Sequence, residues 1–241
     1  MRNQALEPSR QFALTLLLRI LHPLIIGTAL LATLCALAGW DDLFRLAKPL
    51  PMALAVASLL AGRGGERRGR HLLTVAMTAA LAGDVLLLNG DWFLFGLLAF
   101  LITHLTYLVL FRRAVGWFPS RLALAAILAV AAAVLAWEFP LLPSGLVAPV
   151  AIYTGVIALM VAQASGRAVA LGTRDAWLVA AGAALFMASD TMISINRFVL
   201  PFGWSNVAIM ATYYAGQILI LRHALAAARM ADGDDLAAPR L

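Results

Sequence analysis

The sequence predicts an all-α integral membrane protein, a polytopic bundle of eight transmembrane helices. Composition is the first indication: 63% of the 241 residues are hydrophobic and only 12% are charged, whereas soluble domains are about 25% charged. The second is the grouping of apolar residues into runs of about 20, the length that an α-helix needs to cross a bilayer. The third is that basic residues cluster between these runs.

Eight apolar segments follow one another along the chain. They are Leu16–Leu37, Leu46–Ala61, Leu72–Leu88, Trp92–Phe111, Leu122–Trp137, Val147–Ala164, Ala176–Ile195 and Val207–Leu225. The first ends in a possible signal-peptidase site, but its length favours a helix that is retained. Because the connections are short, we expect a single domain over residues 1–241, with an N-terminal segment 1–12, a bundle 13–226 and a polar tail 227–241.

The basic residues alternate between the two sides of this arrangement. One side receives Arg2, Arg10, Arg63, Arg67, Arg68, Arg70, Arg112, Arg113, Arg121, Arg167, Arg174, Arg222, Arg229 and Arg240. The other receives only Arg45, Lys48 and Arg197. Since cytoplasmic loops are enriched in Lys and Arg, both termini are predicted to be cytoplasmic. The net charge of +6 does not indicate nucleic-acid binding, because the basic residues do not line one face.

The third and fourth segments resemble the seventh and eighth. Asp84 is followed by Phe95-Gly96, and Asp190 is followed by Phe202-Gly203. Because both pairs run in the same direction, they suggest a parallel internal repeat. The Ala- and Leu-rich composition could also produce this similarity by chance.

Two aspartates lie inside apolar runs, where an ionisable residue is costly and is usually functional. Asp84 lies fourteen residues beyond Arg70 and Asp190 sixteen beyond Arg174. At about 1.5 Å per residue both are roughly 20–25 Å from the cytoplasmic side. If the two helices are adjacent, one carboxyl could stay protonated while the other is ionised. The alternative is that each aspartate ties neighbouring helices together through hydrogen bonds.

Further polar residues are predicted nearby. His104 and Tyr107 share one face of the fourth segment, and Tyr213, Tyr214 and Gln217 form a stripe on the eighth. They either line a cavity or hydrogen-bond between packed helices.

The only basic residue predicted on the outer side after Asp190 is Arg197, seven positions later. It could turn back towards the carboxylate or anchor to lipid headgroups, as Lys48 could. Of the four histidines, only His104 lies well inside a segment. We therefore expect no metal site and no cofactor.

Several short motifs follow one another in a defined order. They are Lys48-Pro49-Leu50, Gly83-Asp84, Phe95-Gly96 with Phe100, His104 and Tyr107, Ser189-Asp190 with Asn196-Arg197-Phe198, and Tyr213-Tyr214 with Gln217. In order and placement they resemble the motifs of the YhhN-like lysoplasmalogenase family. The resemblance implies an eight-helix hydrolase that cleaves the vinyl ether bond of lysoplasmalogens. The products would be a fatty aldehyde and glycerophosphoethanolamine or glycerophosphocholine.

The resemblance also implies roles for individual residues. Asp84 and Asp190 occupy the two acidic positions and would be catalytic, one as general acid and the other as an ionised partner. The lysophospholipid would be bound from within the bilayer by Lys48, His104, Tyr107, Asn196, Arg197, Tyr213, Tyr214 and Gln217. The location implied is the bacterial cytoplasmic (inner) membrane, with the chain crossing it several times.

Three alternatives remain open from the sequence. A small-molecule or proton-coupled transporter could use the same aspartates. A zinc-dependent lipid amidase of the ceramidase type would also place its site inside a helical bundle, but a single deep histidine argues against it. A scaffold protein would tolerate substitution of both aspartates.

Overall fold

The computed structural model describes residues 6–62 and 67–231, and within them all regular structure is helical. The helices are α1 (Leu6–Ala38), α2 (Asp41–Ala47), α3 (Leu50–Ala61), α4 (Arg67–Leu86), α5 (Phe93–Phe111), α6 (Arg121–Glu138), α7 (Ser144–Leu171), α8 (Arg174–Ser194) and α9 (Ser205–Ala231). Short turns, η1 (Gly90–Trp92), η2 (Phe139–Leu141) and η3 (Ile195–Val199), follow α4, α6 and α8. The predicted all-α class is confirmed. Arg2, Arg63, Arg240 and the tail from Asp232 onward lie outside the described residues.

Six helical stretches among these residues are long and apolar enough to cross a membrane. They are Ile20–Ala38, Asp41–Ala61, Gly90–Phe111, Arg121–Leu141, Ser144–Leu171 and Arg174–Val199. The remaining two predicted segments also lie on helices, α4 and α9, which are more polar. The first turn of α4 carries Arg67, Arg68 and Arg70, and α9 carries the stripe of tyrosines and Gln217. Eight crossings therefore stay a prediction.

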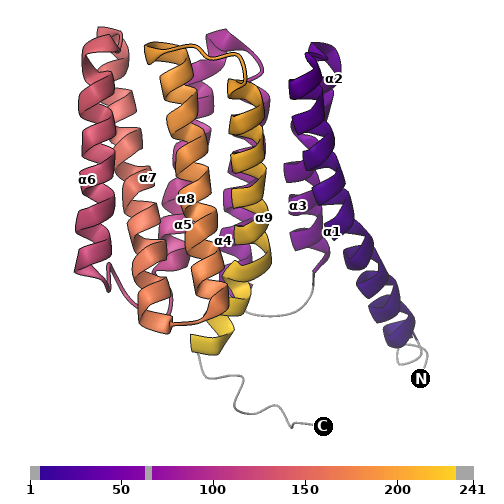
Figure 1. The fold of residues 1–241 in the computed structure, drawn as a ribbon. Coiled ribbons are helices and arrows are strands. Elements are labelled where there is room, and N and C mark those ends of the chain that lie inside the picture. The colour runs from indigo at the N-terminus through magenta and orange to yellow at the C-terminus, as the bar shows by residue number, and fades with distance from the viewer. Residues whose placement is uncertain (1–5, 63–66, 232–241) are drawn as a thin grey trace.

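The helices stand roughly side by side along one bundle axis (Figure 1). Neighbouring pairs in contact are α1 with α3 and α9, α4 with α3 and α5, and α7 with α5, α6 and α8. The most extensive packing joins α8 to α9. The start of α1 and the end of α9 lie at the same end of the bundle, and α2 lies at the other (Figure 1).

Two glycines set the spacing between helices near the buried polar residues. A Cβ on Gly182 of α8 would lie 2.8 Å from the carbonyl oxygen of Gly216 on α9, so only glycine permits this approach. A Cβ on Gly83 of α4 would lie 2.6 Å from the ring of Phe100 on α5. These contacts bring α8 close to α9 and α4 close to α5.

Candidate active site

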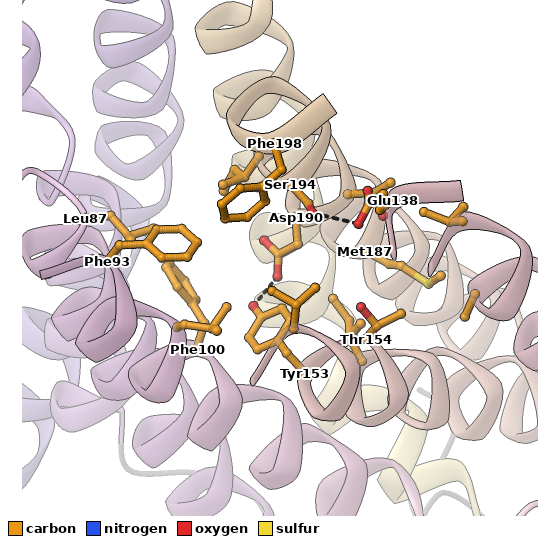
Figure 2. Close-up of a pocket in the computed structure, with 17 residues that line it drawn as sticks. Leu87, Phe93, Phe100, Glu138, Tyr153, Thr154, Met187, Asp190, Ser194 and Phe198 are labelled. Carbon is orange, nitrogen blue, oxygen red and sulfur yellow. Dashed lines mark hydrogen bonds between the residues drawn. The ribbon is translucent and has the colours of Figure 1, made fainter. Parts of the chain in front are cut away.

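Asp190 on α8 is held by side chains from two other helices. The hydroxyl of Tyr153 on α7 donates a hydrogen bond to Oδ2 of Asp190, and Nε2 of His104 on α5 lies 3.0 Å from the same oxygen (Figure 2 shows Asp190 and Tyr153). His104 Nε2 also lies 2.8 Å from the Tyr153 hydroxyl, and His104 is fully buried. The three polar side chains therefore form one compact hydrogen-bonded group in an otherwise apolar interior.

Asp84 on α4 belongs to a second polar group. The Tyr213 hydroxyl on α9 donates a 2.8 Å hydrogen bond to its Oδ2. Lys48, at the junction of α2 and α3, is itself buried and attracts Asp84 electrostatically. The adjacent Tyr214 donates a 2.8 Å hydrogen bond to the Lys48 carbonyl oxygen. Tyr213 and Tyr214 thus fix the Asp84 side chain and the Lys48 backbone, respectively.

One aromatic ring connects the two groups. Phe186, one turn before Asp190 on α8, packs edge-on against His104 at 4.7 Å between ring centroids and against Tyr213 at 5.2 Å. One aromatic ring thus lies between the two groups, and each carboxylate has its own hydrogen-bond donor.

Tyr107 and Gln217 form a third polar contact between α5 and α9. The Tyr107 hydroxyl donates a 2.6 Å hydrogen bond to Oε1 of Gln217, and both residues are fully buried. Neither lines the two cavities described next. The hydrogen bond joins these two helices, and a role of either residue in substrate binding stays a prediction.

A narrow cavity, named here the inner cavity, lies beside Asp190. Its volume is about 50 Å³, room for a few waters at the roughly 10–15 Å³ that each requires. It lies between α5, α6, α7 and α8, and its walls are mainly apolar (Figure 2). The polar side chains on it are Glu138, Tyr153, Thr154, Asp190, Thr191 and Ser194.

A larger cavity of about 570 Å³, the outer cavity, lies at the end of the bundle where α2 sits. Polar and charged side chains line much of it: Asp41, Arg45, Lys48, Asn196, Arg197 and Asn206. The two cavities share the walls formed by Leu87, Phe93 and Ile193. A polar chamber for a charged group thus adjoins an apolar one that contains an acid.

The π-helical turn η3 serves both cavities. It places Asn196 and Arg197 on the outer cavity and Phe198 on the inner one; such turns are frequent at functional sites. The Arg197 guanidinium lies 4.1 Å from the centroid of the Phe93 ring, on the wall between the cavities. Asn196 also accepts a 3.1 Å hydrogen bond from the backbone N–H of Phe202 and so closes the loop before α9.

The structure adds two polar residues that the sequence interpretation missed. Tyr153 lies within an apolar segment, and its hydroxyl was the only sign that it had a partner. Glu138 directly follows the predicted end of a segment at Trp137, yet it is only 2% exposed. Among the described residues no group of three or more His, Cys, Asp and Glu side chains is placed to hold a metal ion.

Fold and site together define a multi-pass helical membrane protein with buried carboxylates beside adjoining apolar and basic cavities. Residues 43–224 match the model of the YhhN family, and the chain belongs to that family. It is 36% identical over 182 residues to the lysoplasmalogenase of Mycobacterium tuberculosis, covering 71% of this chain and 66% of that protein. The matched region thus spans just under two thirds of the mycobacterial protein's length. No solved structure matches the chain.

Mammalian relatives are also similar. Lysoplasmalogenase TMEM86B of Sus scrofa is 33% identical over 180 residues, covering 73% of this chain and 72% of that protein. Lysoplasmalogenase TMEM86A of Homo sapiens is 30% identical over 151 residues, covering 61% of this chain and 62% of that protein.

Proposed function

We propose that this protein hydrolyses the vinyl ether bond of a lysoplasmalogen, or of a related lyso-ether lipid, within the membrane. The observation that carries the proposal is the position of Asp190, on an apolar cavity that adjoins a larger cavity lined by Lys48 and Arg197. The phosphate and the vinyl ether of one lipid match a basic chamber that adjoins an apolar one containing an acid. The names of the relatives point to the same substrate class and favour hydrolysis over transport.

The phosphate of the lipid would bind in the outer cavity. Lys48 and Arg197 supply positive charge there, and charge-assisted hydrogen bonds to phosphate are stronger than neutral ones. Asn196 and Asn206 add amide groups to the same walls. The vinyl ether would then pass the Leu87–Phe93 wall and lie against Asp190.

The first chemical step is a proton transfer to carbon. Asp190 in its neutral form gives its proton to the alkene carbon next to the ether carbon, leaving an oxocarbenium ion. Asp84, as the ionised member of the pair, stabilises that cation through its field. The Tyr213 hydroxyl donates a hydrogen bond to this carboxylate.

The second step restores Asp190. Water attacks the oxocarbenium carbon while the Asp190 carboxylate takes a proton from it, giving a hemiacetal. The hemiacetal then breaks down: the glycerol oxygen leaves as an alcohol and the former ether carbon becomes the aldehyde. Tyr153 and His104 keep the carboxyl oriented throughout, since both contact the same oxygen.

We also propose eight crossings with both termini in the cytoplasm of a bacterial inner membrane. In support, α1 begins and α9 ends at one end of the bundle (Figure 1). Arg68, Arg112 and Arg113 gather around one cavity of about 330 Å³. Arg68 lies at the start of α4, whereas Lys48 shares the outer cavity with Leu87 and Leu88, just beyond the end of that helix.

The test is aldehyde release from a lysoplasmalogen incubated with the purified protein, detected by mass spectrometry. Asp190→Asn and Asp84→Asn are each expected to lower the rate at least 100-fold, within the range that general acid–base groups contribute. Asp175→Asn is the matched control, because Asp175 is on α8 as well but pairs with His223 at 2.6 Å. Near-normal turnover by both site variants would refute the mechanism.

A further inference from the structure

Glu138 is a third buried carboxylate, and the proposed reaction does not use it. It is the last residue of α6, is 2% exposed and lies on the inner cavity. Its Oε2 accepts a 2.7 Å hydrogen bond from the Ser194 hydroxyl (Figure 2). Within the described part of the chain, no group donates a hydrogen bond to its other oxygen, Oε1.

An unpaired buried carboxylate oxygen is costly. Leaving a buried polar atom without a partner loses its hydration and gains nothing in return, and the loss is larger for a charged group. Leu87, Phe93 and Phe100 are among the apolar walls of this cavity. A ligand that brings its own hydroxyl into the cavity would supply the missing donor.

The order of residues along α8 indicates which hydroxyl this is. Ser194, the partner of Glu138, is four residues beyond Asp190, and Arg197 is seven beyond it. At about 1.5 Å per residue these positions lie roughly 6 and 10 Å further along the axis. Along the bundle axis, Asp190 therefore comes first, the Glu138–Ser194 pair second, and the Arg197 guanidinium at the outer cavity third.

A lysolipid presents its groups in the same order. In an extended chain each bond advances about 1.2 Å, as in a polypeptide backbone. The hydroxyl on the middle glycerol carbon is five bonds from the protonated alkene carbon, about 6 Å. The phosphorus is seven bonds away, about 8 Å, within reach of a long arginine side chain. With the alkene at Asp190, the hydroxyl lies at the level of Glu138.

We propose that Glu138 accepts a hydrogen bond from the free hydroxyl on the middle glycerol carbon and so selects lysolipids over lipids acylated there. The proposal rests on the proposed function, because it takes the vinyl ether to be placed at Asp190. An acylated lipid has no proton at that oxygen, so Glu138 would stay unpaired. Glu138 is thus a specificity-determining residue, distinct from the proton-transferring acids.

The experiment compares two substrates that differ in one atom. One is the lysoplasmalogen, and the other is its analogue with hydrogen in place of the middle hydroxyl. Wild-type protein is expected to show a kcat/KM for aldehyde release about 10- to 100-fold higher with the hydroxyl present, the range for a hydrogen bond to a charged group. Glu138→Met is expected to reduce this ratio to within about threefold of unity while retaining turnover of the analogue.

Thr154→Val is the matched control, since it removes a hydroxyl from the same cavity at nearly constant volume. Its substrate ratio is expected to equal that of the wild type; a ratio near unity in this variant would assign the selection to Thr154 instead and overturn the proposal. A wild-type kcat/KM ratio near unity between the two substrates would overturn the proposal without any variant. An equal loss of kcat/KM on both substrates in Glu138→Met would also overturn it. If wild-type protein releases aldehyde from neither substrate, the proposed function fails instead.

Discussion

Tyr213 donates a 2.8 Å hydrogen bond to Asp84, and both side chains are almost completely buried. The contact joins α9 to α4 across 129 positions of sequence. It fixes an acid inside the bundle and holds it against the helix that also carries the buried Tyr214. The hydrogen bond therefore has both a structural and a chemical consequence, which can be separated by substitution.

Replacing Tyr213 by Phe removes the donor and leaves an Asp84 oxygen unpaired. We expect the free energy of unfolding to fall by about 1–2 kcal/mol and kcat for aldehyde release to fall about tenfold. Tyr214→Phe is the comparison, because Tyr214 donates to the Lys48 carbonyl rather than to a carboxylate. It should lower stability by a similar amount with a smaller change in kcat. Equal effects on kcat would show that Asp84 does not need its donor.

The contacts of Tyr153 and Tyr107 predict opposite outcomes for the same substitution. Tyr153→Phe removes the hydroxyl that holds Asp190 and should lower kcat about 10- to 100-fold with little change in KM. Tyr107→Phe breaks the hydrogen bond to Gln217 away from both cavities, so its main effect should be a loss of about 1 kcal/mol in stability. Steady-state kinetics and thermal unfolding in detergent measure both. A larger loss of kcat in Tyr107→Phe than in Tyr153→Phe would indicate that Tyr107 acts in catalysis.

The helical class and the depth of the two aspartates were predictable from the sequence, because both follow from the order and spacing of residues along the chain. The clusters of arginine predict a similar depth for Asp84 and Asp190, and the structure places the ring of Phe186 between their hydrogen-bonded groups. The helical class followed from composition and is confirmed. The parallel repeat stays a prediction.

The partners of the acids were less predictable, because they depend on how helices rotate against each other. Most faces of α7 are apolar, so periodicity could not show that Tyr153 points inwards. Glu138 sits at a helix end, where a charged residue ordinarily faces water. The π-helical turn η3, which divides Asn196 and Arg197 from Phe198, has no signal in composition.

Removing the charge of Arg197 should affect binding more than chemistry. Its guanidinium lies on the wall between the two cavities, where the lipid phosphate is proposed to bind. Arg197→Met is expected to raise KM for the lysolipid about tenfold and to change kcat less than threefold. With an alkenyl glycerol that lacks the phosphate, wild type and variant should give the same KM. Arg222→Met, an exposed substitution on α9, serves as the charge-matched control; a similar rise in KM there would indicate a general loss of attraction to the lipid.

The Gly182–Gly216 contact predicts a strong difference between two glycine substitutions. A Cβ on Gly182 would meet the Gly216 carbonyl oxygen at 2.8 Å, so Gly182→Ala must push α8 away from α9. Because α8 carries Asp190 and α9 carries Tyr213, we expect a loss of about 1–3 kcal/mol in stability together with lower activity. Gly155→Ala on α7 is the control, since a Cβ there meets nothing within 4 Å; it should leave activity intact and raise stability by up to about 1 kcal/mol. Thermal unfolding of both variants in detergent measures the difference, and equal stability would show that the two helices do not pack as closely as described.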